Sequence, residues 1–176
     1  LLENAVMRYQ VSGTAPGPLG ARHPSITPFE AYKTKDGYII ISAGNDGLFA
    51  KLAEALENPG WAENPDYSSN DNRNKHVEKL KIEMESVLTA HTTSHWIEVL
   101  DKFGVPSGPI NDIGQAATHP QTLARNMIVS VEDPITGPMK VAGNPIKISG
   151  FEDPETREPA PNLDQNREQI LRELTD

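Results

Sequence analysis

The chain has 176 residues, enough for one ordinary domain or for part of a larger protein. It contains no cysteine, which excludes disulfides, thiolate metal sites and a cysteine nucleophile and fits a cytoplasmic protein. The formal net charge of -9 argues against nucleic acid or an anionic membrane surface as a partner, because no basic field attracts phosphates. The longest apolar run, Tyr38–Ile41, is far shorter than the ~20 residues of a membrane helix.

The first segment has the pattern of one face of an amphipathic helix. The apolar residues at helical spacing are Leu1, Leu2, Ala5, Val6 and Tyr9. Because the chain opens inside this pattern, we expect the natural N-terminus to lie upstream. Residues 13–28 contain Pro16, Pro18, Pro24 and Pro28 and cannot form a regular helix or strand, so they predict a long connection.

A β-hairpin is predicted next, with strands at 29–34 and 38–43 and the turn signal Lys35-Asp36-Gly37 between them. Asn45 or Asp46 then caps a short helix. The inward face of that helix carries Leu48, Phe49, Leu52, Ala53 and Leu56. Residues 61–70 are predicted to be a loop.

Two further helices are predicted from the 3.6-residue period. The first runs from about residue 72 to residue 90, with its apolar face inward. Thr93 or Ser94 caps the second, in which Trp96, Leu100 and Phe103 share a face that packs on the hairpin. The second helix ends before Gly104, which stands where a left-handed residue is favoured.

The rest of the chain is predicted as short elements between prolines. Residues 105–110 are extended, and helices are expected at 111–118 and 120–125. A second hairpin pairs 127–132 with 139–142, and a Pro-rich arm leads to a last helix at 167–174. Segregated strands and helices favour an α+β fold, a small two-layer domain of β-hairpins and helices, over a parallel wound sheet.

Three isolated polar residues are candidates for chemistry, and each also has a structural interpretation. Asp46 lies between a predicted strand and a helix, where active-site groups often lie, although spacing alone favours an N-cap. His23 and His119 each precede a proline, which fixes the direction of the imidazole and suits an acid or base. A buried histidine that closes a turn through a hydrogen bond is the favoured interpretation of both.

Two segments resemble binding motifs but lack essential parts of them. His91 and His95 have metal-ligand spacing, but they straddle a predicted helix start, and the glutamate base of a zinc hydrolase is missing. Solvated surface histidines are favoured, and no metal site is predicted. Gly13–Gly20 resembles a phosphate loop, but Pro16 and Pro18 remove two donors and a strand follows instead of a helix.

Eight short motifs follow one another along nearly the whole chain in the order of one family. They are Gly20–Glu30, Thr34–Tyr38, Ala43–Phe49, Asn72-Arg73, Thr93–Trp96, Gly104–Ile110, His119–Gln121 with Arg125–Met127, and Gly143–Ile146. In these motifs the chain resembles the C-terminal half of a class III coenzyme A transferase. This CaiB/BaiF-type family includes formyl-CoA and carnitine CoA-transferases and acyl-CoA racemases.

The resemblance implies how the chain is divided. Residues 1–24 would be a helix and a Gly/Pro linker from a larger Rossmann-like domain. Residues 25–127 would be the small α+β domain. Residues 128–176 would be a hairpin, a Pro-rich return arm and a C-terminal helix that run back to the large domain. Because two chains interlock in the family, the resemblance also implies a homodimer.

The resemblance further implies transfer of CoA between an acyl-CoA and a carboxylic acid through an aspartyl-CoA intermediate. The family's nucleophilic aspartate and most contacts to the nucleotide of CoA lie in the N-terminal half. This chain alone is therefore expected to be inactive, to bind no cofactor tightly, and to meet its acyl-CoA and acid substrates only together with that half.

Within this chain, the resemblance implies one catalytic candidate and a lid. Related racemases have a glutamate acid/base near the position of Asp46, which makes Asp46 a candidate for a pocket-lining role. Gly13, Gly17, Gly20 and His23 lie where the family has a glycine-rich lid over the thioester. That lid is interrupted by prolines in this sequence, which argues against the lid behaviour of oxalate-specific members.

Two alternatives stay open at this point. The chain could be a stand-alone dimeric interaction module from a truncated gene, which an upstream reading frame with an aspartate would exclude. It could also be a fragment of an acyl-CoA racemase, which exchange of the α-proton of an acyl-CoA with solvent would distinguish from a transferase.

Overall fold

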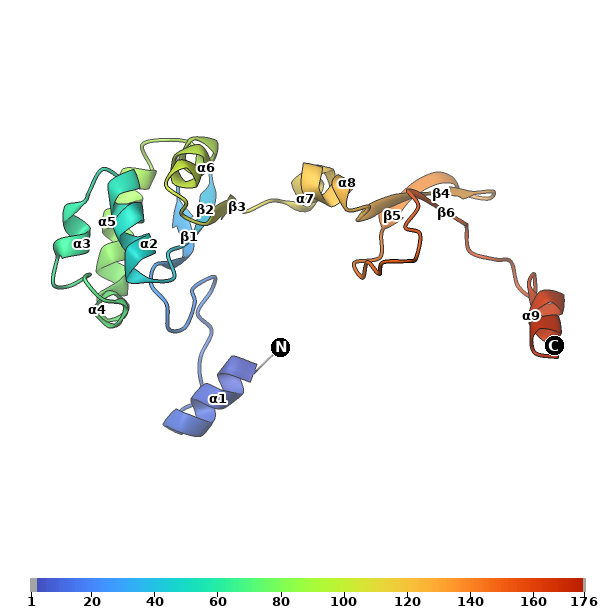
Figure 1. Ribbon diagram of the computed structural model, residues 1–176, viewed down its shortest axis with the longest axis horizontal. Helices are drawn as coiled ribbons and strands as arrows, with labels where there is room; N and C mark the ends of the chain where they lie inside the picture. The colour runs from blue at the N-terminus through green and yellow to red at the C-terminus, as the bar shows by residue number, and fades with distance from the viewer. Residues whose placement is uncertain (1–2, 176) are drawn as a thin grey trace. The chain divides into compact units, whose positions relative to one another are not determined.

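The computed structural model describes residues 3–175, and the chain divides into two compact units between Ile110 and Asn111 (Figure 1). The predicted division at residues 24 and 127 stays a prediction about the domains of the whole protein. The predicted first helix is confirmed as α1, Glu3–Ser12. Leu1 and Leu2, which were assigned to its apolar face, lie outside the described residues.

The N-terminal unit is built on an antiparallel sheet in the order β1-β2-β3. Its strands are β1 (Phe29–Lys33), β2 (Tyr38–Ser42) and β3 (Ser107–Pro109). Side chains alternate between the faces of a strand, and one face buries Tyr32 together with its cross-strand partner Ile39. The first predicted hairpin is therefore confirmed. The third strand comes from the segment that was predicted only as extended.

Helices between β2 and β3 supply the rest of the core. They are α2 (Asp46–Ala55), α3 (Gly60–Glu63), α4 (Asn70–Lys75), α5 (Val77–Leu88) and α6 (Thr93–Lys102). Apolar side chains of α2, α5 and α6 form one cluster with the buried face of the sheet. The fully buried members from these helices are Phe49, Leu52, Leu80, Met84, Leu88 and Leu100. This packing confirms the predicted α+β class.

Two predicted features of the helical region are wrong. The predicted loop at 61–70 contains α3 and the first residue of α4. The predicted helix at 72–90 is two helices, which meet at His76 with φ of -113° and ψ of 25°. The Ser69 hydroxyl accepts a hydrogen bond from the Asn72 N–H and caps α4, which explains its early start.

Trp96 and Leu100 are buried as predicted, but Phe103 is 37% exposed. The indole Nε1 of Trp96 donates to the Leu88 carbonyl at 2.7 Å, so the ring joins α6 to the end of α5. Phe103 is the C-cap residue of α6, and Gly104 follows with φ of +68°. Phe103 therefore lies where the chain leaves the helix, outside the buried stripe.

The C-terminal unit contains a second sheet, in the order β5-β4-β6. Its elements are α7 (Ile113–Thr118), α8 (Pro120–Ala124), β4 (Ile128–Asp133), β5 (Gly137–Ala142), β6 (Thr156–Arg157) and α9 (Arg167–Glu173). The antiparallel pair β4–β5 confirms the second predicted hairpin, and β6 pairs with β4 in parallel.

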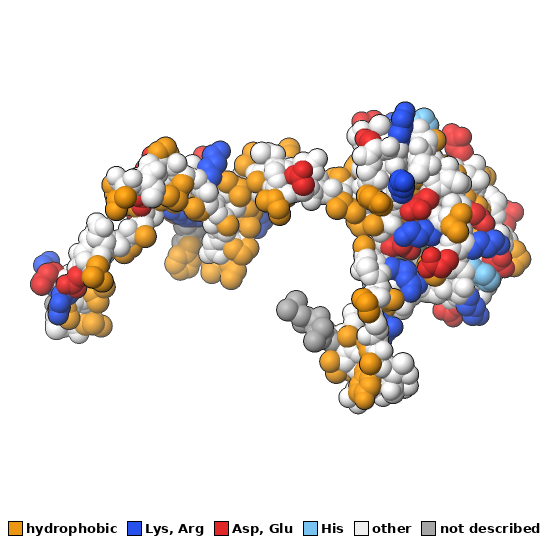
Figure 2. Space-filling model, turned by 180° about the vertical axis from the view of Figure 1, so that it is seen from behind, with side chains coloured by type: hydrophobic (Ala, Val, Ile, Leu, Met, Phe, Trp, Pro, Cys, Tyr) orange, Lys and Arg blue, Asp and Glu red, His pale blue; other side chains and the backbone are white. Residues whose placement is uncertain are grey.

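Many large apolar side chains outside the core are exposed, and they include residues of α1 and of the C-terminal unit (Figure 2). In α1 these are Val6, Met7, Tyr9 and Val11. Beyond residue 143 they are Ile146, Ile148, Phe151, Leu163, Ile170, Leu171 and Leu174. In the part of the chain that the structure describes, no helix has both the length and the apolar composition needed to cross a membrane.

A polar junction fastens the first hairpin turn to the start of α6. The Asp36 carboxylate accepts hydrogen bonds from the Thr93 N–H at 2.8 Å and from the Thr93 hydroxyl at 3.1 Å. The hydroxyl oxygens of Thr34 and Thr93 are 2.7 Å apart, and the Lys35 N–H donates to the His91 carbonyl. The backbone hydrogen bond from Thr93 is the main cause that lowers the pKa of Asp36.

We expect Asp36→Asn to flatten the acid dependence of stability. Because the folded pKa of Asp36 lies below its unfolded value, ionised Asp36 stabilises the fold above the unfolded pKa, and this contribution is lost as pH falls through the folded pKa. Urea unfolding at a series of pH values from 6 to 3 should show a smaller loss in the variant than in the parent. Asp101→Asn, on the exposed side of α6, is the control. Equal acid losses in parent and Asp36→Asn would contradict the role.

Candidate functional site

Asp46 is the first residue of α2 and is not its N-cap. Asn45 is the cap, because its side-chain oxygen accepts from the Leu48 N–H at 2.9 Å. The N-cap interpretation of Asp46 is therefore wrong. The Asp46 side chain is 62% exposed, and its Oδ1 accepts from Nη2 of Arg73 at 2.7 Å. One carboxylate oxygen is thus held from inside the protein while the side chain stays accessible to solvent.

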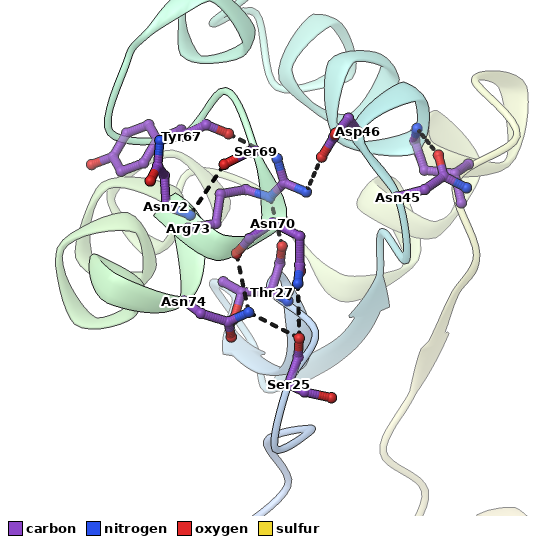
Figure 3. A network of polar contacts seen from close by, with 11 residues as sticks. Ser25, Thr27, Asn45, Asp46, Tyr67, Ser69, Asn70, Asn72, Arg73 and Asn74 are labelled. Atoms are coloured by element: carbon purple, nitrogen blue, oxygen red, sulfur yellow. Dashed lines mark hydrogen bonds and ion pairs between the residues drawn. The ribbon is translucent and has the colours of Figure 1, made fainter.

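Arg73, on α4, is fully buried and forms the centre of the site (Figure 3). Its Nε donates to the Thr27 carbonyl at 2.7 Å, and its Nη1 donates to the Tyr67 carbonyl at 2.8 Å. The guanidinium carbon lies 4.5 Å from the centroid of the Phe49 ring. The planar fork therefore binds three acceptors in fixed directions and lies over an aromatic face, which a lysine ammonium could not do.

Two asparagines of α4 extend the network to the end of the Gly/Pro connection. Asn70 accepts from the Thr27 N–H through its side-chain oxygen and donates to the Ser25 carbonyl through its amide nitrogen. Asn74 accepts from the Thr27 hydroxyl at 2.8 Å and also donates to the Ser25 carbonyl, at 2.9 Å. Residues 25–27 are therefore fixed to α4 on both backbone and side-chain atoms (Figure 3).

His23 precedes residues 25–27 and contacts both this segment and the first residue of β1. Its ring stacks on Phe29 with centroids 5.2 Å apart, and its Nδ1 accepts from the Ser25 N–H at 3.2 Å. The His23 N–H donates to the Phe29 carbonyl. His119 similarly accepts from the Gln121 N–H and caps α8. Both histidines therefore close a turn through a hydrogen bond, as the favoured interpretation expected, but neither is buried: His23 is half-buried and His119 is exposed.

The predicted lid residues precede this anchor in the chain. Gly13 and Gly20 have φ of +68° and +63°, a region that favours glycine, whereas Gly17 does not. A side chain at any of these three glycines would meet open space. The preference for glycine at Gly13 and Gly20 therefore comes from their positive φ and not from crowding. No hydrogen bond among the described residues joins these glycines to Asp46 or Arg73. Their assignment as a lid stays a prediction.

The two histidines with metal-ligand spacing lie together. The rings of His91 and His95 stack with centroids 4.3 Å apart, although both side chains are exposed as expected. Within residues 3–175, no cluster of three His, Cys, Asp or Glu side chains is arranged to hold a metal ion.

Sequence reasoning missed the role of Arg73. The Asn72-Arg73 motif was identified, but the helical period assigned inward positions only to apolar residues. The available signal was the recurrence of asparagine at residues 70 and 74 on either side of this arginine. Residues at i and i+4 share a helix face, so these two asparagines flank Arg73 on the face toward residues 25–27. Their partners come from segments more than forty residues away, which no local pattern identifies.

The fold is shared with solved proteins of one known class. A solved structure of a CAIB/BAIF family protein from Brucella suis superimposes with a TM-score of 0.76 and 30% identity, covering 99% of this chain and 44% of that chain. The sequence profile of CoA-transferase family III matches residues 1–167, and the chain belongs to this family. The predicted family resemblance is confirmed.

Two relatives show what share of the family architecture is present. The chain is 37% identical over 173 residues to an acetyl-CoA:oxalate CoA-transferase of Acetobacter aceti, covering 98% of this chain and 43% of the relative. It is 35% identical over 155 residues to a succinyl-CoA:glutarate CoA-transferase of Homo sapiens, covering 88% of this chain and 35% of the relative. The chain therefore spans less than half the length of these relatives.

We expect Arg73→Met to lower the free energy of unfolding by about 3–5 kcal/mol, because the Thr27 and Tyr67 carbonyls lose their charged donor. Arg73→Lys should recover only part of this loss, since an ammonium cannot reach all three acceptors. Lys79→Met, which removes a 53% exposed partner of Asp66, is the matched control and should have a much smaller effect, because an exposed ion pair is screened by solvent. Chemical denaturation measures all three, and equal effects of Arg73→Met and Lys79→Met would refute the central role of Arg73.

Proposed function

We propose that the chain is the C-terminal portion of a class III CoA-transferase, an enzyme that moves CoA between an acyl-CoA and a carboxylic acid through an aspartyl-CoA intermediate. The observation that carries this proposal is the family match over residues 1–167. The two relatives described above are both named as transferases, which favours a transferase over a racemase. Their acids are oxalate and glutarate, so short dicarboxylic acids are the first acceptors to test.

In this proposal the chain supplies one wall of the active site, and the N-terminal half supplies the covalent aspartate. Several aspartates already have partners within the fold: Asp36 accepts from Thr93, Asp66 pairs with Lys79, and Asp153 pairs with Lys147 and Arg157. Asp46 is the carboxylate among the residues labelled in Figure 3, and its side chain is accessible to solvent, but Arg73 holds one of its oxygens. This geometry suits a hydrogen-bond acceptor that lines a pocket better than a nucleophile.

The anchoring of its C-terminal end supports the lid assignment. Residues 25–27 are fixed by Arg73, Asn70 and Asn74, so a segment before them could move about a defined point. We propose that Gly13, Gly17, Gly20 and His23 cover the thioester when both halves are present. The enzyme is proposed to act in the cytoplasm, without nucleic-acid or membrane partners.

The chain alone is expected to show no CoA transfer and no tight CoA binding. Incubation with acetyl-CoA and oxalate or glutarate should give no new thioester by liquid chromatography. Hydroxylamine should trap no acyl group on the protein, because the covalent aspartate is proposed to lie in the other half. Co-expression with the N-terminal half of the Acetobacter relative is the positive control. Transfer by this chain alone, or a hydroxylamine-sensitive label on any of its carboxylates, would overturn the assignment.

We also expect the chain to form a homodimer. Leaving a large aliphatic side chain in water forgoes about 1.5–3 kcal/mol, and large apolar residues of α1 and of 143–175 stay exposed in the described part of the chain. Exchange of these segments between two chains would cover them. Sedimentation velocity across a concentration series should show a dimer at the higher concentrations. A monomer at every concentration, with both segments protected from proteolysis, would refute it.

A further inference from the structure

A hollow of about 340 Å³ lies in the N-terminal unit, between the end of α2, the end of α5 and the first turns of α6. Its wall is mostly aliphatic, with Leu56, Val87 and Val99 among the lining residues. Its polar lining comes from His91, His95 and Glu57, and the indole of Trp96 completes it. A concave apolar wall with a few convergent polar groups is typical of small-molecule sites.

The aromatic side chains of the hollow form one cluster. His91 stacks on His95, and Trp96 meets the two imidazoles at centroid distances of 5.6 Å and 5.2 Å, nearly perpendicular to both. Among the described residues, neither imidazole makes a side-chain hydrogen bond, whereas the indole N–H is occupied by Leu88. Aromatic faces carry partial negative charge and attract cations, and clusters of aromatic rings are the usual recognition sites for alkylated ammonium groups.

Glu57 brings a formal negative charge to the same hollow. It follows the C-cap of α2 with φ of +57°, a conformation in which glycine or asparagine is usual. Its side chain is exposed, and no ion pair engages it within the part of the chain that is described. A charged side chain at a strained position next to a hollow indicates a use beyond ending the helix.

Three backbone amides at the start of α6 already have acceptors. The Thr93 N–H is bonded to Asp36, the His95 N–H to the Thr92 hydroxyl, and the Trp96 N–H to the Thr92 carbonyl. A carboxylate or phosphate in the hollow would therefore find these amides occupied and would be repelled by Glu57. The charge of the lining thus favours a positive ligand.

We propose that this hollow binds the alkylammonium group of a small organic cation. The alkyl substituents would lie on the aliphatic wall, and the charge would face the aromatic cluster and Glu57. This site is separate from the Arg73 network and does not depend on the proposed CoA transfer.

The test compares two probes of the same shape and different charge on the full chain. Choline is the cation, and 3,3-dimethylbutan-1-ol is its neutral isostere. At pH 8, choline should shift the backbone NMR signals of Glu57, His95 and Trp96 in a saturable way. Its affinity should exceed that of the alcohol by about tenfold, the usual size of cation–π and charge recognition. Equal affinities, or no saturable shift with choline, would overturn the proposal.

Variants separate the charge from the fold. Glu57→Gln should weaken choline binding severalfold and leave the binding of the alcohol unchanged. Glu54→Gln, on exposed α2 surface outside the hollow, is the matched control and should have no effect. Glu57→Gly should raise the unfolding midpoint, because glycine adopts positive φ without strain, while it still weakens choline binding. Equal losses of choline affinity in Glu54→Gln and Glu57→Gln would exclude a specific role of Glu57.

Discussion

The buried guanidinium of Arg73 is the constraint on which the N-terminal unit depends. Burying an unpaired charge would cost several kcal/mol, so this side chain is compatible with the fold only when its acceptors are in place. Those acceptors are a carbonyl of the Gly/Pro connection, a carbonyl before α4 and the carboxylate of Asp46. The path of three separate chain segments is thereby determined by one residue. The hydrogen bond from Arg73 to Asp46 also sets the direction of the Asp46 carboxylate, which the sequence analysis selected as a site candidate.

The junction between the first hairpin turn and α6 also joins distant segments through an aspartate, but its donors are uncharged. Asp36 in the hairpin turn receives the first free amide of α6, which would otherwise lack a partner. The Thr92 hydroxyl accepts from the N–H of His95, a later amide of α6. The hairpin turn and the residue before α6 thus each supply an acceptor for the first amides of this helix. Motifs that are separated by more than fifty residues thus meet at helix starts. The polar residues of these motifs therefore fix the geometry of the fold.

The sequence predicted the elements that local physics determines and missed those that depend on distant partners. Both hairpins, the capped helix after the first hairpin and the glycine after α6 follow from turn residues, caps and periodicity, which are read within about ten residues. The break at His76 was missed because residues 72–90 contain no glycine or proline that would mark the end of a helix. Arg73 was missed because a periodic pattern assigns charged residues to the surface, and only its distant acceptors make burial favourable.

The two units differ in how much of their stability their own side chains can supply. Among the described residues, the buried apolar side chains belong to the N-terminal unit, with Val129 as the one exception. Sheet hydrogen bonds add little net free energy, so a hairpin and short helices with one buried apolar residue cannot offset the entropy of ordering their backbone. The exposed side chains around Ile146 and Phe151 are the apolar surface that a further partner would cover. This imbalance supports the proposal that the C-terminal unit is completed by contacts beyond this chain, as expected for a segment that spans less than half of its relatives.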